Sequence, residues 1–305
     1  MHVVSIINYK GGVGKTTLTA NLGAGLAWRG YRVLLLDLDP QASLTFSLVK
    51  PDYWTTHLEK DRTIKTWYDA TSSGESASLT SLVMAPTTVN RYLRDTPLDL
   101  IPSHLGLINV DLELASGLAG TSMTQSKRNY LKVHRRLVDG LADEAFLKYD
   151  VILIDCPPNF NIVTKTAIVA SDHILIPAKA DYLSTLGIDY LRRSLDLLVH
   201  DYNEYAQLDL IGSISPEVLG IIFNMVQIYA QEPVSAQRPY IAQARDLGLP
   251  VFKVYTRENK TEYAGAAEEG RPVILNRDDY LGLKSELDDF VDEFIERLGI
   301  LKPDS

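Results

Sequence analysis

A glycine-rich stretch close to the start of the chain constrains the possible fold more than any other feature. It reads Tyr9-Lys10-Gly11-Gly12-Val13-Gly14-Lys15-Thr16-Thr17 and lies between the apolar residues 3–7 and a helix-prone segment at 18–28. A strand, a glycine-rich turn and a helix in this order are the context of a phosphate-binding loop, because the loop N–H groups and the helix N-terminus both attract phosphate oxygens. The glycines let that backbone approach phosphate without a Cβ in the way.

Two lysines and a threonine give this loop its expected chemistry. Lys15 stands where such loops contact the β- and γ-phosphates, and Thr16 stands where their hydroxyl binds Mg²⁺. The ordinary loop reads G-x-x-x-x-G-K-[ST], so Tyr9 replaces its first glycine and Lys10 is an additional lysine. A lone loop lysine is usually solvated, and this is the alternative to a functional role for Lys10.

Apolar runs alternate with helix-prone segments along the chain, and this alternation predicts parallel βαβ units. Strands are expected at 3–7, 31–36, 98–103, 151–155, 173–177, 220–224 and 251–257, and the later helices at 105–114, 126–146, 182–202 and about 280–299. We therefore expect an α/β fold: a single P-loop NTPase domain over 1–305, with a mostly parallel twisted sheet and helices on both faces. Residues 50–97 have a weaker pattern and are expected to form a less regular insertion with short helices.

Aspartates end two of the predicted buried strands. One strand leads into Asp37-Leu38-Asp39-Pro40-Gln41, and another ends in Asp155-Cys156-Pro157-Pro158. Ligands of parallel sheets bind at the carboxyl ends of the strands, so these carboxylates are expected beside the phosphate loop. Asp155 suits a water of the Mg²⁺ shell, since Mg²⁺ keeps several of its waters. The alternatives are a strand-ending turn at Asp39-Pro40 and a helix cap at Asp155.

The string K-G-G-V-G-K-T-T, together with D-x-D-P-Q at 37–41 and D-x-P-P at 155–158, resembles the deviant Walker A box and its companion motifs in the ParA/MinD family of ATPases. The resemblance covers essentially the whole chain apart from 50–97. It implies ATP and Mg²⁺ as cofactors, hydrolysis of ATP to ADP and phosphate, and a switch loop at Pro157-Pro158. It also implies that Lys10 crosses a dimer interface to the partner's nucleotide. Asp39 would position the attacking water and touch the metal shell, while Asp37 supports the loop.

The family motifs assign further residues by position. Asn224 stands where the family reads the adenine edge, although an asparagine at a strand end is otherwise a turn residue. Tyr255-Thr256-Arg257 replaces the family's usual I-P-R, which makes Tyr255 a candidate for stacking on adenine. The implied catalytic residues are Lys10, Lys15 and Asp39; the implied metal residues are Thr16, Asp39 and Asp155; and the implied nucleotide-binding residues are Lys10, Gly11, Gly12, Val13, Gly14, Lys15, Thr16, Thr17 and Asn224.

Composition restricts the classes of protein to consider. The 30 basic and 39 acidic residues give a net charge of −9, so the chain is not coated in positive charge, although local basic patches remain possible. The single cysteine, Cys156, excludes an internal disulfide framework and argues against a relative of the nitrogenase iron protein, whose cluster needs several thiolates. We find no signal peptide and no apolar run near the ~20 residues of a membrane span. The expected compartment is the cytoplasm.

Within the family, the resemblance points to a short ParA-type or McdA-like ATPase. A MinD-like chain would end in a basic membrane helix, but residues 280–299 are acidic, and no N-terminal extension precedes the first strand. The implied function is an ATP-bound homodimer that binds non-specific double-stranded DNA on the nucleoid, with no membrane contact. It positions a plasmid, a chromosome region or a protein organelle, and a ParB-like or McdB-like adaptor stimulates hydrolysis. Candidate DNA contacts are Arg192, Arg193, Arg238 and Arg245, with the basic run at 127–136 as a rival that could equally be a solvated face.

Two other classes share this fold. A metabolic P-loop enzyme, such as an amidoligase or a dethiobiotin-synthetase-like carboxylase, needs an acceptor pocket, and no residues for one are evident in the sequence. A bacterial tyrosine kinase would typically carry a tyrosine-rich tail, whereas this chain ends in Leu301-Lys302-Pro303-Asp304-Ser305.

Overall fold

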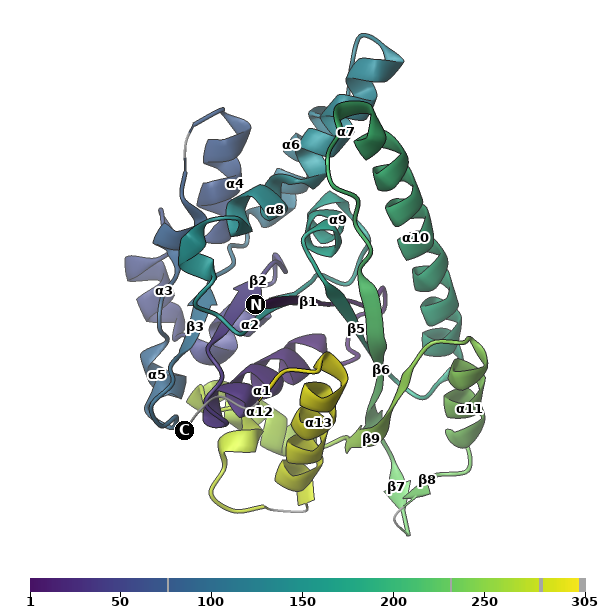
Figure 1. Ribbon diagram of the computed structural model, residues 1–305. Coiled ribbons are helices and arrows are strands. Elements are labelled where there is room, and N and C mark those ends of the chain that lie inside the picture. The colour runs from purple at the N-terminus through teal and green to yellow at the C-terminus, as the bar shows by residue number, and fades with distance from the viewer. Residues whose placement is uncertain (76, 231, 280–281, 302–305) are drawn as a thin grey trace.

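Seven strands, all paired in parallel, form the central sheet of the protein (Figure 1), in the order β3-β2-β4-β1-β5-β6-β9. The computed structural model describes residues 1–75, 77–230, 232–279 and 282–301. The strands are β1 (His2–Ile6), β2 (Val33–Asp37), β3 (Leu98–Ile101), β4 (Val151–Asp155), β5 (His173–Ala178), β6 (Glu217–Val226) and β9 (Val251–Arg257). A short antiparallel pair, β7 (Ile228–Tyr229) and β8 (Glu232–Pro233), follows β6.

The strands are buried on both faces because their side chains alternate between two apolar cores. In β1, Val4 and Ile6 contribute to one core while Val3 and the adjoining Ile7 contribute to the other. A strand with this double burial reads as an unbroken apolar run, which is the pattern of parallel sheets covered by helices on both sides. The register aligns Asp37 with Asp155 across β2 and β4, so the two carboxylates end at the same edge.

Helices cover both faces of the sheet (Figure 1). The core on one face includes residues of α1 (Lys15–Trp28), α2 (Ser43–Leu48), α3 (Pro51–His57), α5 (Thr87–Asn90) and α13 (Leu283–Leu298), with side chains of α12 (Lys260–Glu269) packed against it. The other core includes residues of α4 (Ile64–Ser72), α6 (Leu107–Ser116), α7 (Met123–His134), α8 (Arg136–Leu141), α9 (Ile162–Val169), α10 (Tyr182–Ala206) and α11 (Arg238–Asp246). Short 3-10 turns complete the chain at Leu79–Leu82, Glu144–Phe146, Gln207–Asp209 and Val273–Leu275.

The predicted fold class is confirmed: the chain is an α/β domain with a parallel sheet flanked by helices. Every predicted strand is present, with ends that differ by a few residues. The expected segment at 50–97 contains short helices and one isolated bridge from Met84 to Leu100. In the described ranges, none of the helices has the length and apolar character needed to cross a membrane.

The prediction of one long helix at 126–146 is wrong. The segment divides into α7, α8 and a final 3-10 turn, with Arg135 at a ψ of −11° between the first two. Both halves still pack inward: Val133 of α7 and Leu137 of α8 belong to the main core, and Leu131 of α7 joins a small cluster with Tyr202 of α10. The apolar spacing therefore continues across the break, although the backbone does not form one uninterrupted helix.

The acidic C-terminal helix packs on the domain. The predicted start near residue 280 lies outside the described residues, and α13 begins at Leu283. Arg297 joins this helix to two strands, since its guanidinium donates to the carbonyls of Leu219 (3.0 Å) and Val251 (2.7 Å) and lies 4.1 Å from the centre of the Phe252 ring. Glu293 pairs with Arg297 at 2.7 Å and accepts from backbone N–H groups of β9.

We predict that Arg297→Met destabilises the protein by about 2 kcal/mol, because two strand carbonyls lose their donors while the aliphatic stem over Phe252 is kept. Lys284→Met is the matched control on α13, since Lys284 forms a surface pair with Asp288 and its loss should cost at most about 0.5 kcal/mol. Urea unfolding followed by circular dichroism measures both variants. Equal midpoints for the two would contradict the role given to Arg297.

Candidate functional site

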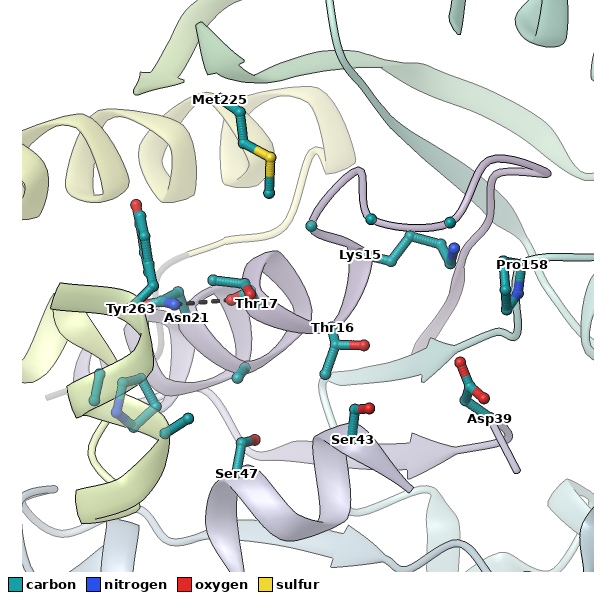
Figure 2. A pocket seen from close by; sticks show the side chains of 17 residues that line it. Lys15, Thr16, Thr17, Asn21, Asp39, Ser43, Ser47, Pro158, Met225 and Tyr263 are labelled. Carbon is teal, nitrogen blue, oxygen red and sulfur yellow. Dashed lines mark hydrogen bonds between the residues drawn. The ribbon is translucent and has the colours of Figure 1, made fainter. Parts of the chain in front are cut away.

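A cavity of about 410 Å³ opens at the carboxyl edge of the sheet (Figure 2). Lys15, Asp39 and Pro158 lie at one end of it, and Met225 and Tyr263 lie at the other (Figure 2). The lining residues come from the glycine-rich loop, from α1, α2 and α12, from the segment that follows α12, and from the ends of β2, β4 and β6: Gly11, Gly12, Gly14, Lys15, Thr16, Thr17, Ala20, Asn21, Asp39, Ser43, Ser47, Pro158, Met225, Tyr263, Ala266, Ala267 and Pro272.

The loop adopts a conformation that only glycine adopts readily. Gly12 and Gly14 have φ values of 68° and 85°, in the left-handed region. A Cβ on Gly14 would come within 1.9 Å of the Asn224 amide nitrogen. Gly14 therefore lets the loop turn directly into α1, whose free N–H groups face the cavity.

Lys15 carries a buried charge at the base of the loop. Its side chain is only 7% exposed, and Nζ donates over long distances to the carbonyls of Asn8 (3.3 Å) and Lys10 (3.5 Å). Burial lowers the pKa of this ammonium from its ordinary value, and Asp155 and Asp39 partly offset that effect. An ammonium with weak partners at the wall of a cavity is well suited to bind phosphate oxygens.

Asp155 and Asp37 are both fully buried at the ends of neighbouring strands. Asp155 accepts hydrogen bonds from Thr16 (2.7 Å) and Thr19 (3.3 Å) of α1. Burial raises the pKa of Asp37 to about 8, with a further contribution from the charge of Asp155, and burial raises the pKa of Asp155 to about 7. Lys15 supplies a counter-charge to Asp155, whereas hydrogen bonds from Thr45 and Asp39 offset the burial of Asp37.

The two aspartates of the D-x-D sequence have different surroundings. Asp37 accepts from the backbone N–H groups of Asp39 (3.1 Å) and Thr45 (2.8 Å) and from the Thr45 hydroxyl (2.7 Å), so it holds the turn after β2 in place. Asp39 accepts from Gln41 N–H (2.9 Å) and lines the cavity. The supporting role expected for Asp37 agrees with these contacts, and Asp39 is placed where a carboxylate could act on a bound group.

The residues around Thr16 fit a Mg²⁺ ion that keeps most of its waters. Among the described residues there is no group of three or more His, Cys, Asp or Glu side chains that could hold a metal by themselves. A hydroxyl with a carboxylate 2.7 Å away, beside a phosphate cradle, is the donor set that Mg²⁺ takes with nucleotides. Thr16 would bind the ion directly, and Asp155 and Asp39 would bind its waters.

Asn224 supports the loop through a hydrogen bond. Its amide donates to the Val13 carbonyl (2.9 Å), and its oxygen accepts from the Thr256 hydroxyl (2.6 Å) and from Met225 N–H (2.8 Å). It is 4% exposed and does not line the cavity. The amide nitrogen and oxygen that would read adenine are already hydrogen-bonded to the loop and to β9. The contact between Asn224 and adenine stays a prediction.

The end of the cavity opposite Lys15 uses residues that the sequence did not reveal. Met225, at a φ of 56°, and Tyr263 of α12 line it (Figure 2), and Asn21 connects α1 to the turn at Val273–Leu275 through Ile274 N–H (3.0 Å). Tyr255 instead lies in β9, where its hydroxyl accepts from Arg245 (3.2 Å). The sequence signal that could have predicted Met225 as a lining residue is its position directly after Asn224 at the end of a strand, where ligands of parallel sheets bind.

Lys10 is separated from the cavity that Lys15 enters. It is not among the lining residues, and its ammonium pairs with both carboxylate oxygens of Asp181, each at 2.8 Å. The loop therefore directs its two lysines to different places.

The candidate DNA-contact arginines lie on two helices that contact each other, α10 and α11. Asp189 pairs with both Arg192 (3.2 Å) and Arg193 (2.6 Å), and Arg238 pairs with Glu232 (2.8 Å). Arg245 forms no ion pair with any residue that the structure describes.

The rival basic run at 127–136 is largely paired. Lys127 binds Glu204 (2.7 Å), Arg128 binds Asp209 (3.0 Å), and Arg135 binds Asp139 (3.1 Å). Neighbouring carboxylates therefore offset part of its positive charge, as they do for Arg192, Arg193 and Arg238.

Comparison with known proteins identifies the group to which the chain belongs. A family model described as an AAA domain matches residues 1–208. The chromosome partitioning protein ParA of Caulobacter vibrioides is 31% identical over 279 residues, which are 90% of this chain and 87% of that protein. The chain belongs to the ParA/MinD family of P-loop ATPases. Its relatives in that family include partitioning ATPases.

Two solved structures share this family fold. An aspartate-to-alanine variant of McdA from Cyanothece, determined as a complex with ATP, superposes with a TM-score of 0.71 at 24% identity and covers 100% of this chain and 99% of that one. A cobyrinic acid a,c-diamide synthase from Mycobacterium smegmatis, with ADP and magnesium, has a TM-score of 0.59 at 24% identity and covers 88% and 91%. At this identity both likenesses show the fold alone.

We predict that Lys15→Ala lowers the affinity for ATP·Mg²⁺ by about 100-fold or more, because the buried triphosphate loses its main counter-charge. Lys165→Ala is the matched control: it removes the same charge from α9, outside the lining of the cavity. Isothermal titration with ATP measures both. A similar affinity for the two variants would contradict the role of Lys15.

Proposed function

We propose that the protein is a short ParA-type or McdA-like positioning ATPase, whose ATP-bound homodimer binds non-specific DNA and positions a cargo. The observation that carries this proposal is the separation of the two loop lysines: Lys15 lines its own cavity, whereas Lys10 does not. A lysine kept out of its own phosphate site is available to a facing one. The ParA relative and the ATP complex of McdA support the general role.

The proposed cycle assigns a task to each residue of the site. Lys15 and the loop N–H groups hold the phosphates. Thr16 would hold Mg²⁺ and Asp155 would hold its waters, and the ion would supply charge neutralisation at the phosphoryl group. Asp39 orients the attacking water. Pro158, which lines the cavity beside Gly11, belongs to a loop that senses whether the γ-phosphate is present. Lys10 reaches the phosphates of the partner chain and makes dimerisation depend on ATP.

The proposed DNA surface joins α10 and α11 of both subunits. Each subunit contributes Arg192, Arg193, Arg238 and Arg245. The dimer therefore has twice as many arginines for DNA as one acidic chain, which by itself would bind DNA weakly. A ParB-like or McdB-like adaptor would stimulate hydrolysis, dissolve the dimer and release the DNA. The protein would work in the cytoplasm on the nucleoid, without a membrane.

We expect an ATP-loaded sample to bind duplex DNA with an affinity that falls steeply with salt, at a log–log slope of about −0.9 per neutralised phosphate. Fluorescence anisotropy over a salt series measures the slope. Arg245→Ala should reduce it by about one unit per lost contact, whereas Lys132→Ala on α7 should leave it unchanged. Equal binding at low and high salt would contradict a DNA-binding role.

We predict that Asp39→Ala retains ATP binding but loses hydrolysis, so that the dimer stays on DNA. Asp37→Ala is its contrast within the same motif: it should lower the melting temperature, since Asp37 holds the turn after β2. Phosphate release, ATP titration and thermal melting separate the two outcomes. Normal hydrolysis by Asp39→Ala would rule out its proposed task.

The alternative, a metabolic P-loop enzyme of the amidoligase or dethiobiotin-synthetase type, has support in the shared fold of the cobyrinic acid a,c-diamide synthase. It requires turnover that depends on a small acceptor. Steady-state ATPase alone, with DNA, and with candidate carboxylic acid or amine acceptors distinguishes the two. Rapid acceptor-dependent turnover without DNA stimulation would replace our proposal.

A further inference from the structure

The resting position of Lys10 is defined by three hydrogen bonds. Its ammonium donates to both carboxylate oxygens of Asp181 (2.8 Å each) and to the Ser184 hydroxyl (3.3 Å). The side chains of Lys10 and Asp181 remain 30% and 41% exposed, so the pair lies at the surface, where another charged group can reach it. Asp181 and Ser184 therefore compete with any phosphate of a second molecule for the Lys10 ammonium.

The backbone on both sides of Lys10 is held in place. The Asn8 side chain accepts from Lys10 N–H (2.8 Å) and donates to the Pro177 carbonyl (2.7 Å). The Tyr9 hydroxyl donates to Ser194 (3.0 Å), and its ring lies 5.4 Å from the Tyr190 ring. With the loop fixed in this way, a change of partner for Lys10 needs only side-chain rotation.

Asp181 has a second task, because it is the N-cap of α10. Its carboxylate accepts from Ser184 N–H (2.8 Å), which places it over the positive end of a 25-residue helix. The pKa of Asp181 is lowered: partial burial acts to raise it, and the hydrogen bonds from Lys10 and Ser184 outweigh that effect. Without the carboxylate charge, the Lys10 ammonium would face the positive helix end unshielded and would leave it.

We propose that Asp181 is a positioning residue that holds Lys10 in the monomer and releases it when a second ATP-loaded copy offers its phosphates. This inference rests on the proposed ATP-dependent dimer. The pair is half-exposed and correspondingly weak. A triphosphate carries more charge than one carboxylate, so it displaces Asp181, while a nucleotide-free partner does not. Asp181 thus raises the threshold for dimerisation and makes it selective for the loaded state.

The test compares Asp181→Asn with Asp189→Asn in full-length chains that also carry Asp39→Ala to prevent hydrolysis. Asparagine caps helices about as well as aspartate, so Asp181→Asn removes the charge and keeps the cap. Asp189→Asn removes the same charge from the same helix, where it pairs with Arg192 and Arg193 instead. Sedimentation velocity with ATP·Mg²⁺ and without DNA gives the dimer dissociation constants.

We expect Asp181→Asn to tighten the ATP-dependent dimer by roughly 3- to 20-fold, since two weak pairs are removed per dimer, and Asp189→Asn to leave it unchanged. Asp181→Asn and Asp189→Asn should melt at similar temperatures, because the asparagine keeps the helix cap. A tighter dimer of Asp181→Asn alone then reports the release of Lys10 and not a change in folding.

A second measurement does not need a dimer. In the nucleotide-free chain, Asp181→Asn should increase the rate at which an amine-reactive reagent labels Lys10, as read by mass spectrometry, and Asp189→Asn should not. An unchanged labelling rate, or an Asp181→Asn dimer that is no tighter than its parent, would overturn the inference while leaving the proposed function intact. Failure of the Asp39→Ala parent to dimerise with ATP would overturn both.

Discussion

The site depends on the burial of two neighbouring carboxyl groups at the edge of a parallel sheet. The register of β2 and β4 ends both strands in a fully buried aspartate, Asp37 and Asp155, and α1 brings the Lys15 ammonium close to Asp155. Such charges are costly to bury unless each finds partners. Threonine hydroxyls and backbone N–H groups satisfy the carboxylates, but the carbonyls near Lys15 satisfy it only weakly. The Lys15 ammonium therefore remains available to bind an anion at the loop.

The loop couples this site to the rest of the molecule. Asn224 connects it to the ends of β6 and β9, and the left-handed Gly14 is what allows that close approach. On its other side, Tyr9 and Lys10 connect it to α10. The loop is therefore in direct side-chain contact with α10, the helix that carries Arg192 and Arg193.

Much of the fold could be predicted because local patterns agree with the tertiary structure. Doubly buried strands read as unbroken apolar runs, so each of the seven predicted strands is present. The break in the helix at 126–146 could not be predicted, because the apolar spacing continues through Arg135 and side chains on both sides of it face the same core. The far end of the cavity was missed for a related reason. Met225 and Tyr263 come from segments far apart in sequence, and neither belongs to a motif.

The sequence by itself determined that the chain has a phosphate-binding loop between a strand and a helix, with carboxylates at the ends of neighbouring strands. These features are local: a glycine requirement, a helix N-terminus and a strand that ends in aspartate. Only the tertiary structure decided where the two lysines of the loop point. Lys15 and Lys10 are five residues apart, yet one is buried against the cavity and the other binds Asp181, far along the chain. The motif gives the two lysines different expected roles, but it cannot name the partner of Lys10, because that partner belongs to a helix that meets the loop only after folding.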